Sequence, residues 1–218
     1  MITENLWKNP VSHHIDLPYL RYLPADFDPD SEKLWPLVVF LHGAGERGDT
    51  LVDVYRNGPF RFGEQTDFPF LMVAPQCPNN DYWGAHIETL DDFLEDMLEN
   101  LPVDRDRVYL TGLSMGGTGT WLWSLASPQK FAAILPVCGT GVYWYGEALR
   151  DVPVWAWHGD VDSVVPVQES VNMVSAVNKR GGCAKITILP GIDHDSWVQA
   201  YEGDGWYRWL LSHKKANQ

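Results

Sequence analysis

Cysteine and long apolar runs are both scarce in this chain of 218 residues. The three cysteines, Cys77, Cys138 and Cys183, are widely spaced and form no Cys-x-x-Cys pair or His/Cys cluster, which argues against a zinc site and indicates reduced thiols. No apolar run is long enough to span a bilayer. Residues 1–8 also lack the apolar core of a signal peptide, which favours a cytoplasmic location, although removal of a signal peptide would leave the same sequence.

Basic residues are few as well. Sixteen lysines and arginines stand against twenty-nine aspartates and glutamates, so the formal net charge is −13. Such a chain repels phosphate backbones and anionic lipid surfaces, which argues against nucleic acid or a membrane as partner. No composition break or repeat divides the chain, and its length suits one α/β unit, so residues 1–218 are predicted to form a single domain. The oligomeric state cannot be read from the sequence.

The most informative motif is a serine between two glycines. Residues 107–110 read as a strand, and the segment from Gly112 through Ser114 to Gly116 follows directly. A strand that turns sharply into a helix needs small residues beside the pivot, because bulky side chains would keep the two elements apart. The turn would expose the Ser114 hydroxyl, and the following helix would point its N-terminus at negative charge developing there. The pattern predicts a nucleophile elbow.

Three other segments of the chain support this interpretation. Residues 36–41 read as a buried strand that leads into the loop 42–48. Residues 154–157 form a strand-like run before a loop with two aspartates, and residues 186–189 precede the loop that carries His194. The order serine, aspartate, histidine, with each residue just beyond a strand, is the α/β-hydrolase order.

With these segments in this order, the chain resembles the small α/β-hydrolases of the phospholipase/carboxylesterase type, often called predicted peptidases. That family is related to dienelactone hydrolases and acyl-protein thioesterases. The resemblance runs from about residue 16 to residue 211. It rests on residues 41–48 and 74–78, the serine elbow, and residues 158–166 and 191–194. It implies a mostly parallel central sheet with helices on both faces and no lid domain, but it does not name a substrate.

Alternating strand and helix patterns agree with such a sheet. Residues 14–23 are predicted to form an edge strand and residues 70–73 a central one. Helices are predicted at residues 88–101, directly after the elbow, at 167–180, and at 197–211 with an interruption at 203–205.

The predicted chemistry is acyl transfer. A serine hydroxyl is a weak nucleophile, so His194 is expected to take the proton of Ser114 as it attacks a carbonyl carbon. Asp162 matches the acid position of the family and would orient and support the imidazolium, whereas Asp160, nearer the strand end, is expected to brace the loop. The backbone N–H groups of Ala44 and Met115 are predicted to form the oxyanion hole. His42 and His158 are expected to be structural.

Substrate-binding residues are predicted from loops near these positions. Trp83, Tyr143, Trp144, Tyr145 and Trp197 could form the wall of an acyl or aromatic pocket, and packing at the exposed edge of a small domain is an equal alternative. Trp155 and Trp157 alternate along a strand and are expected in the core. Glu46 either pairs with Arg47 to fix the oxyanion loop or faces the alcohol side of the substrate.

The leading prediction is a serine carboxylesterase, without metal or cofactor, that hydrolyses small to medium esters with short-chain or aromatic acyl groups through an acyl-enzyme on Ser114. The stretch 139–152 is too short for a helical lid, so soluble esters should be preferred. An acyl-thioesterase, a lysophospholipase or a peptidase with the same triad are the alternatives within this chemistry. A carbohydrate-binding or scaffold module with a relic site is the alternative of another class.

Overall fold

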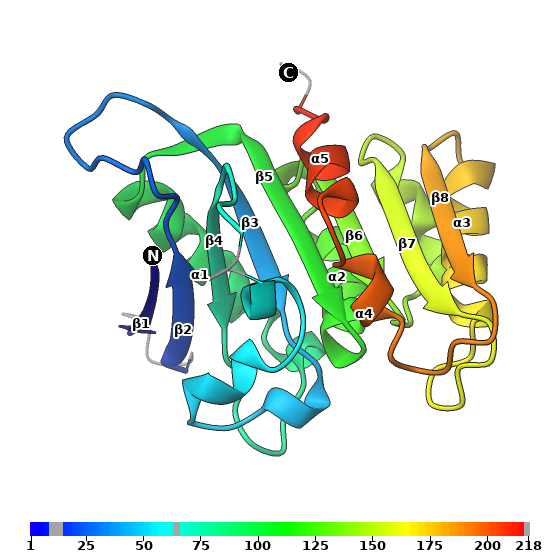
Figure 1. The fold of residues 1–218 in the computed structure, drawn as a ribbon. Coiled ribbons are helices and arrows are strands. Elements are labelled where there is room, and N and C mark those ends of the chain that lie inside the picture. The colour runs from blue at the N-terminus through cyan, green and yellow to red at the C-terminus, as the bar shows by residue number, and fades with distance from the viewer. Residues whose placement is uncertain (9–14, 63–65, 216–218) are drawn as a thin grey trace.

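The computed structural model describes residues 1–8, 15–62 and 66–215. A sheet with strand order β1-β2-β4-β3-β5-β6-β7-β8 runs through the molecule, with helices on both faces (Figure 1). Strands β1 and β2 are antiparallel to their neighbours, and β3 to β8 are parallel. The strands are β1 Ile2–Trp7, β2 Leu17–Tyr22, β3 Trp35–Leu41, β4 Leu71–Pro75, β5 Val103–Leu113, β6 Ala133–Val137, β7 Val154–Gly159 and β8 Ala184–Leu189. The predicted mostly parallel α/β sheet is confirmed.

Helices α1, α2 and α3 cover one face, and α4 and α5 lie on the other (Figure 1). The α-helices are α1 Ile87–Asn100, α2 Met115–Ala126, α3 Gln168–Lys179, α4 Trp197–Ala200 and α5 Gly205–Leu211. The 3₁₀ helices are η1 Ala44–Glu46, η2 Leu51–Tyr55, η3 Pro59–Phe62, η4 Trp83–Ala85, η5 Pro128–Lys130 and η6 Tyr143–Leu149. The predicted helices match within one or two residues at each end. Between β6 and β7 the chain forms only η6 as regular structure, so no lid domain is inserted there.

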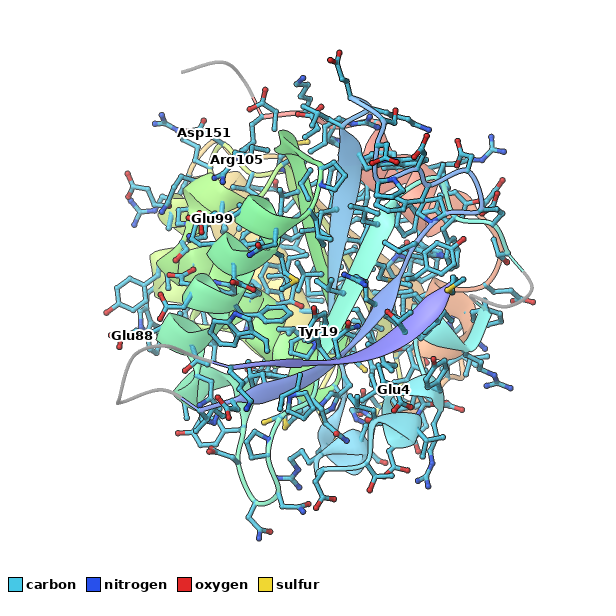
Figure 2. All side chains as sticks on the ribbon, turned by 90° about the vertical axis from the view of Figure 1, so that its left-hand side faces the viewer. Glu4, Tyr19, Glu88, Glu99, Arg105 and Asp151 are labelled. Carbon is cyan, nitrogen blue, oxygen red and sulfur yellow. The ribbon has the colours of Figure 1, made fainter. Side chains whose placement is uncertain are left out.

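The two faces of the sheet have separate cores because side chains alternate along a strand. In β3, Leu37 and Val39 belong to the core on the side of α1, α2 and α3, whereas Val38 and Phe40 belong to the core that includes residues of α5 and η3. Trp155 and Trp157 are only partly buried and lie at the margin of the second core. Figure 2 shows the acidic residues Glu88 and Glu99 of α1 on the solvent side of that helix.

The edge of the sheet differs from the prediction. Residues 14–23 were expected to form the edge strand, but β2 pairs with both β1 and β4, and β1 is the outer strand (Figure 2). His14 itself lies outside the described residues. Strand β1 is hard to recognise in the sequence because both Glu4 and Leu6 are exposed, so its apolar residues do not alternate with its polar ones.

The parallel strands carry their carboxyl ends to one edge of the sheet. In the register of β5 with its neighbours, Gly112 lies opposite Leu41 of β3 and Leu113 opposite Val137 of β6. The loops after β3, β5, β7 and β8 therefore meet at this edge, where the predicted site residues lie. No helix in the described part of the chain is long and apolar enough to cross a membrane.

Candidate active site

Ser114 forms the sharp turn between β5 and α2. Its backbone has φ 54° and ψ −115°, a conformation that L-residues rarely adopt and that costs on the order of 1–3 kcal/mol. The turn also needs glycine at position 116, because a Cβ there would lie 1.9 Å from the carbonyl oxygen of Leu41. The N–H of Ser114 donates to the carbonyl of Val137 at 2.9 Å, which fixes the turn against β6. The hydroxyl is thus held on a rigid, strained turn.

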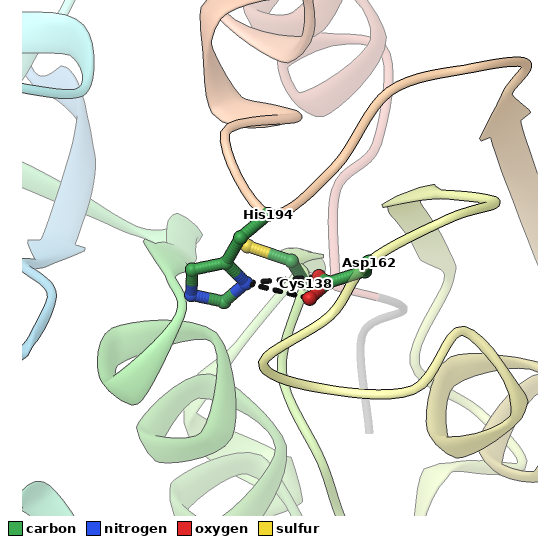
Figure 3. A group of neighbouring side chains, drawn as sticks. All are labelled: Cys138, Asp162 and His194. Carbon is green, nitrogen blue, oxygen red and sulfur yellow. Dashed lines mark hydrogen bonds and ion pairs between the residues drawn. The ribbon is translucent and has the colours of Figure 1, made fainter.

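The structure brings Ser114, His194 and Asp162 together. The Ser114 Oγ lies 2.8 Å from Nε2 of His194, and Nδ1 of that ring lies 2.9 and 3.0 Å from the two carboxylate oxygens of Asp162. An imidazole protonated at Nδ1 donates to the carboxylate and accepts the serine hydroxyl proton at Nε2. Figure 3 shows the histidine ring and the carboxylate facing each other.

The Asp162 carboxylate is fully buried yet well supplied with donors. It accepts hydrogen bonds from the backbone N–H groups of Val164 at 2.9 Å and Val165 at 2.8 Å. Burial alone would raise its pKa, but the bonds from His194 and these two amides outweigh burial and hold the pKa below its usual range. The carboxylate is therefore an anion at neutral pH.

Asp160 has a different position. Its carboxylate accepts the N–H of Gly191 at 2.6 Å, so it ties the end of β7 to the loop after β8. That contact braces the loop that carries His194 without touching the imidazole.

His158, near the end of β7, is fully buried and contacts the loop that carries Asp162. Its Nε2 is 2.8 Å from the carbonyl oxygen of Val165 and 3.2 Å from an oxygen of Asp162, and its Nδ1 is 2.8 Å from the Ser170 hydroxyl. A ring protonated at Nε2 donates to the Val165 carbonyl, and its Nδ1 accepts from the Ser170 hydroxyl. His158 therefore holds the turn that presents the carboxylate.

The predicted oxyanion donors occupy equivalent positions on two helices. Ala44 is the first residue of η1 and Met115 the first of α2, so neither N–H has an acceptor within its own helix. His42 fixes the loop before Ala44. Its Nε2 accepts the N–H of Cys77 at 2.9 Å, which leaves the proton on Nδ1, 2.6 Å from the Gly43 carbonyl oxygen. A peptide unit is planar and trans, so the Gly43 carbonyl and the Ala44 N–H point in opposite directions. The carbonyl points to His42, and the N–H of Ala44 therefore points away from that ring.

His42 is uncharged in this position. Burial lowers its pKa from 6.5 to about 4, although its bond to the Gly43 carbonyl acts in the other direction. A neutral ring is what the two contacts require, since it must accept at one nitrogen and donate at the other.

Glu46 and Arg47 do not act as an ion pair. The Arg47 guanidinium donates to the carbonyls of Ala44 at 2.9 Å and Asp81 at 3.0 Å. Glu46 is buried, and one carboxylate oxygen accepts from Asn57 at 2.5 Å while its backbone carbonyl accepts from Gln76. These contacts fix the loop 42–48. Asn57 gives no signal in the sequence, because its role depends on a contact between distant segments.

The predicted aromatic residues lie in three different environments. Trp197 is half-buried beside the triad, with its ring edge-on to His194 at 5.4 Å and its Nε1 donating to Asn57 at 3.2 Å. Trp83 is fully buried, so its prediction as a pocket wall is wrong. Its Nε1 donates to the His42 carbonyl, and α2 packs against it at Gly119, where a Cβ would lie 2.7 Å from the Cβ of Trp83.

Tyr143 and Trp144 are exposed and pack on each other, with ring centroids 4.5 Å apart. They line a groove between η6 and α3, called here the η6–α3 groove, and they are not in contact with the triad. The other residues that line it are Asn172, Ser175, Ala176, Lys179 and Arg180.

Within the described part of the chain, one group of side chains has a composition that suits a metal ion. The ligand atoms of Cys138, Asp162 and His194 lie within 4.8 Å of one another (Figure 3). Burial raises the pKa of the Cys138 thiol to about 12, so the sulfur is protonated at neutral pH rather than the thiolate that a metal binds. The other two groups are already hydrogen-bonded to each other. This arrangement suits proton transfer better than metal binding. All three cysteines are free, as predicted.

A hydrogen-bonded serine, histidine and aspartate at the carboxyl edge of this sheet define the class: the molecule has the α/β-hydrolase fold. Residues 68–202, more than half of the chain, match the model of the phospholipase/carboxylesterase family. The chain belongs to that family, as its sequence motifs predicted.

Relatives of this chain include esterases. A bifunctional acetylxylan esterase/xylanase of Neocallimastix patriciarum is 28% identical over 154 residues, 68% of this chain and 22% of that protein. A probable feruloyl esterase C of Aspergillus flavus is 24% identical over 88% of this chain and 72% of its own length. The crystal structure of a thermostable esterase, 32% identical with a TM-score of 0.85, covers 98% of this chain, which spans 63% of that one. The chain therefore spans less than two thirds of the first and third of these proteins.

Proposed function

We propose that this protein is a serine carboxylesterase that hydrolyses small to medium soluble esters through an acyl-enzyme on Ser114. The observation that carries the proposal is the hydrogen-bonded path from Ser114 Oγ through the His194 ring to the buried Asp162 carboxylate. Family membership supports the same reaction type, and a metal or cofactor has no step in it. An assembled triad also disfavours a binding module with a relic site.

The reaction follows from the positions of these atoms. Ser114 Oγ attacks the ester carbonyl carbon while Nε2 of His194 takes the hydroxyl proton, and the same nitrogen then returns the proton to the leaving alcohol. Asp162 supports the imidazolium as an anion, in agreement with its lowered pKa. The N–H groups of Ala44 and Met115 bind the oxyanion, and a donor of this kind is worth about 10²–10³ in kcat. Water then hydrolyses the acyl-enzyme with His194 again as base.

The names of the relatives favour acetyl and feruloyl esters as substrates. Acetylxylan esterase denotes a short acyl group, and feruloyl esterase an aromatic one. Trp197, half-buried and edge-on to His194, offers an aromatic surface beside the nucleophile for either group. The segment between β6 and β7 is too short for a lid, so we expect no activation at a lipid interface.

Rates on p-nitrophenyl acetate, butyrate, octanoate and palmitate, below and above the micellar limit, test this proposal. Acyl groups from acetyl to about hexanoyl should react fastest, because each further methylene contributes about 0.8 kcal/mol only where the pocket buries it. Methyl ferulate, an acetylated sugar and an acyl thioester, assayed in parallel, separate the alternatives. Ser114→Ala is the control. A maximum at palmitate, or a jump in rate at the interface, would contradict the proposal.

A further inference from the structure

The η6–α3 groove is a formed depression of about 370 Å³ outside the triad. Its walls are packed closely enough to keep its shape. A Cβ on Gly146 would lie 2.9 Å from the Cβ of Ala176, and a Cβ on Gly141 would lie 2.7 Å from the sulfur of Met173. The 3₁₀ helix η6 is therefore in close contact with α3, and the groove runs along this contact.

The aromatic residues of the groove are directed outward. Tyr143 is 44% and Trp144 65% exposed, although they could bury much apolar area if they packed inward. Exposed aromatic rings that gather on a surface commonly mark a binding site. Asn172 and Ser175 of α3 add an amide and a hydroxyl to the same groove. The surface thus combines flat apolar faces with hydrogen-bonding groups.

The charge of the groove is opposite to that of the chain. The whole protein carries a formal charge of −13, yet the groove is lined by Lys179 and Arg180 and by no acidic residue. Arg180 also makes an exposed ion pair with Glu147 of η6 at 3.3 Å, and exposed pairs of this kind contribute little free energy. An anionic ligand repelled by most of this surface would find its complement here.

The chain connects the groove to the helix that follows the nucleophile. Gly139 packs on α2 so closely that a Cβ there would lie 2.3 Å from the backbone carbon of Gly117, three residues after Ser114. Tyr143 follows four residues later, so its Cα lies within about 14 Å of that of Gly139.

We propose that the η6–α3 groove binds an oligosaccharide that carries a carboxylate, such as a uronic acid branch, as part of the ester substrate. Saccharide rings present apolar C–H faces that match the rings of Tyr143 and Trp144, and their hydroxyls match Asn172 and Ser175. The carboxylate pairs with Lys179 and Arg180. The inference rests on the proposed esterase function for its choice of ligand, but binding in the groove can be measured without turnover.

Calorimetric titration of the Ser114→Ala protein with a glucuronate-bearing xylo-oligosaccharide, and with the neutral oligosaccharide of equal length, tests the groove. The acidic ligand should bind more tightly, and salt should weaken its binding. Trp144→Ala should raise the Kd by about tenfold. Lys179→Gln should raise it several-fold for the acidic ligand only. Tyr145→Ala is the matched control, because Tyr145 is equally exposed in the same helix but does not line the groove.

Hydrolysis of p-nitrophenyl acetate, measured on the same variants with intact Ser114, separates the two proposals. Trp144→Ala and Lys179→Gln should leave this rate unchanged and raise KM only for an acetylated acidic oligosaccharide. Equal affinity for the acidic and neutral ligands, no effect of Trp144→Ala, or no binding at all would overturn the groove proposal while acetate hydrolysis persists. If the unaltered protein does not hydrolyse p-nitrophenyl acetate, the esterase proposal is overturned instead.

Discussion

The polar side chains of the triad are buried or half-buried and hydrogen-bonded to one another, whereas the aromatic side chains of η6 project into solvent from a backbone that is held in place. The Asp162 carboxylate accepts from His194 and two backbone amides, and even the neighbouring His158 has a partner at both ring nitrogens. Among the aromatic rings of the described residues, Trp144 contacts only its neighbour Tyr143. The difference teaches that the bond-breaking part of the site depends on fixed geometry, while the ligand-binding rim depends on exposed surface.

Removal of either reacting group should have the largest effect. Ser114→Ala and His194→Ala should each lower kcat by about 10⁴–10⁶, and the double variant should be hardly worse, because the two residues act as a unit. Steady-state rates on p-nitrophenyl acetate measure the loss, and thermal unfolding checks that the variants fold. A folded Ser114→Ala protein that keeps more than a few per cent of activity would exclude the acyl-enzyme mechanism.

The two aspartates of the loop after β7 should differ sharply. Asp162→Asn should lower kcat by about 10³–10⁴, because the amide leaves the imidazole in the wrong tautomer and its cation without support. Asp160→Asn, two residues earlier in the same loop, is the matched control. It should lower kcat far less, since the Asp160 carboxylate binds the Gly191 N–H and not the imidazole ring. The reverse ranking would assign the acid to Asp160.

The smallest of these effects concerns stability rather than rate. The pKa of His42 is lowered from 6.5 to about 4 in the folded protein. As the pH falls below about 6.5, the unfolded chain takes up a proton that the folded protein refuses, so the free energy of unfolding should fall by at most about 3 kcal/mol by pH 4. The lowered pKa of Asp162 adds a loss in the same direction as that carboxylate becomes protonated.

Urea unfolding at a series of pH values measures this slope. His42→Gln should flatten it, because glutamine can donate and accept without titrating. Equal slopes in His42→Gln and the unaltered protein would contradict a buried neutral His42.

The sheet, the main helices and the positions of Ser114, Asp162 and His194 could be predicted because each depends on local sequence. Strands end in short loops, and parallel strands bring those loops to one edge. The environment of an aromatic residue is not local. Trp83 lies in η4, shortly before α1 in the sequence, but its burial depends on α2 packing over it at Gly119. The role of Asn57 could not be predicted for the same reason, since it joins Glu46 to Trp197, which lies 140 residues further along the chain than Asn57.

Asn57 also has a consequence for how this site can diverge. Its amide nitrogen donates to Glu46 of the oxyanion loop, and its amide oxygen accepts from Trp197, whose ring packs on His194. The Asn57 side chain therefore links the loop that carries Ala44 to the segment that packs on His194. A substitution at either place should disturb both. Segment η6 is tied to α3, by packing and by the exposed ion pair of Glu147 with Arg180, and the printed contacts of Asn57 do not reach it. Substitutions that change substrate preference should therefore be tolerated more readily in η6 than in the two loops that Asn57 joins.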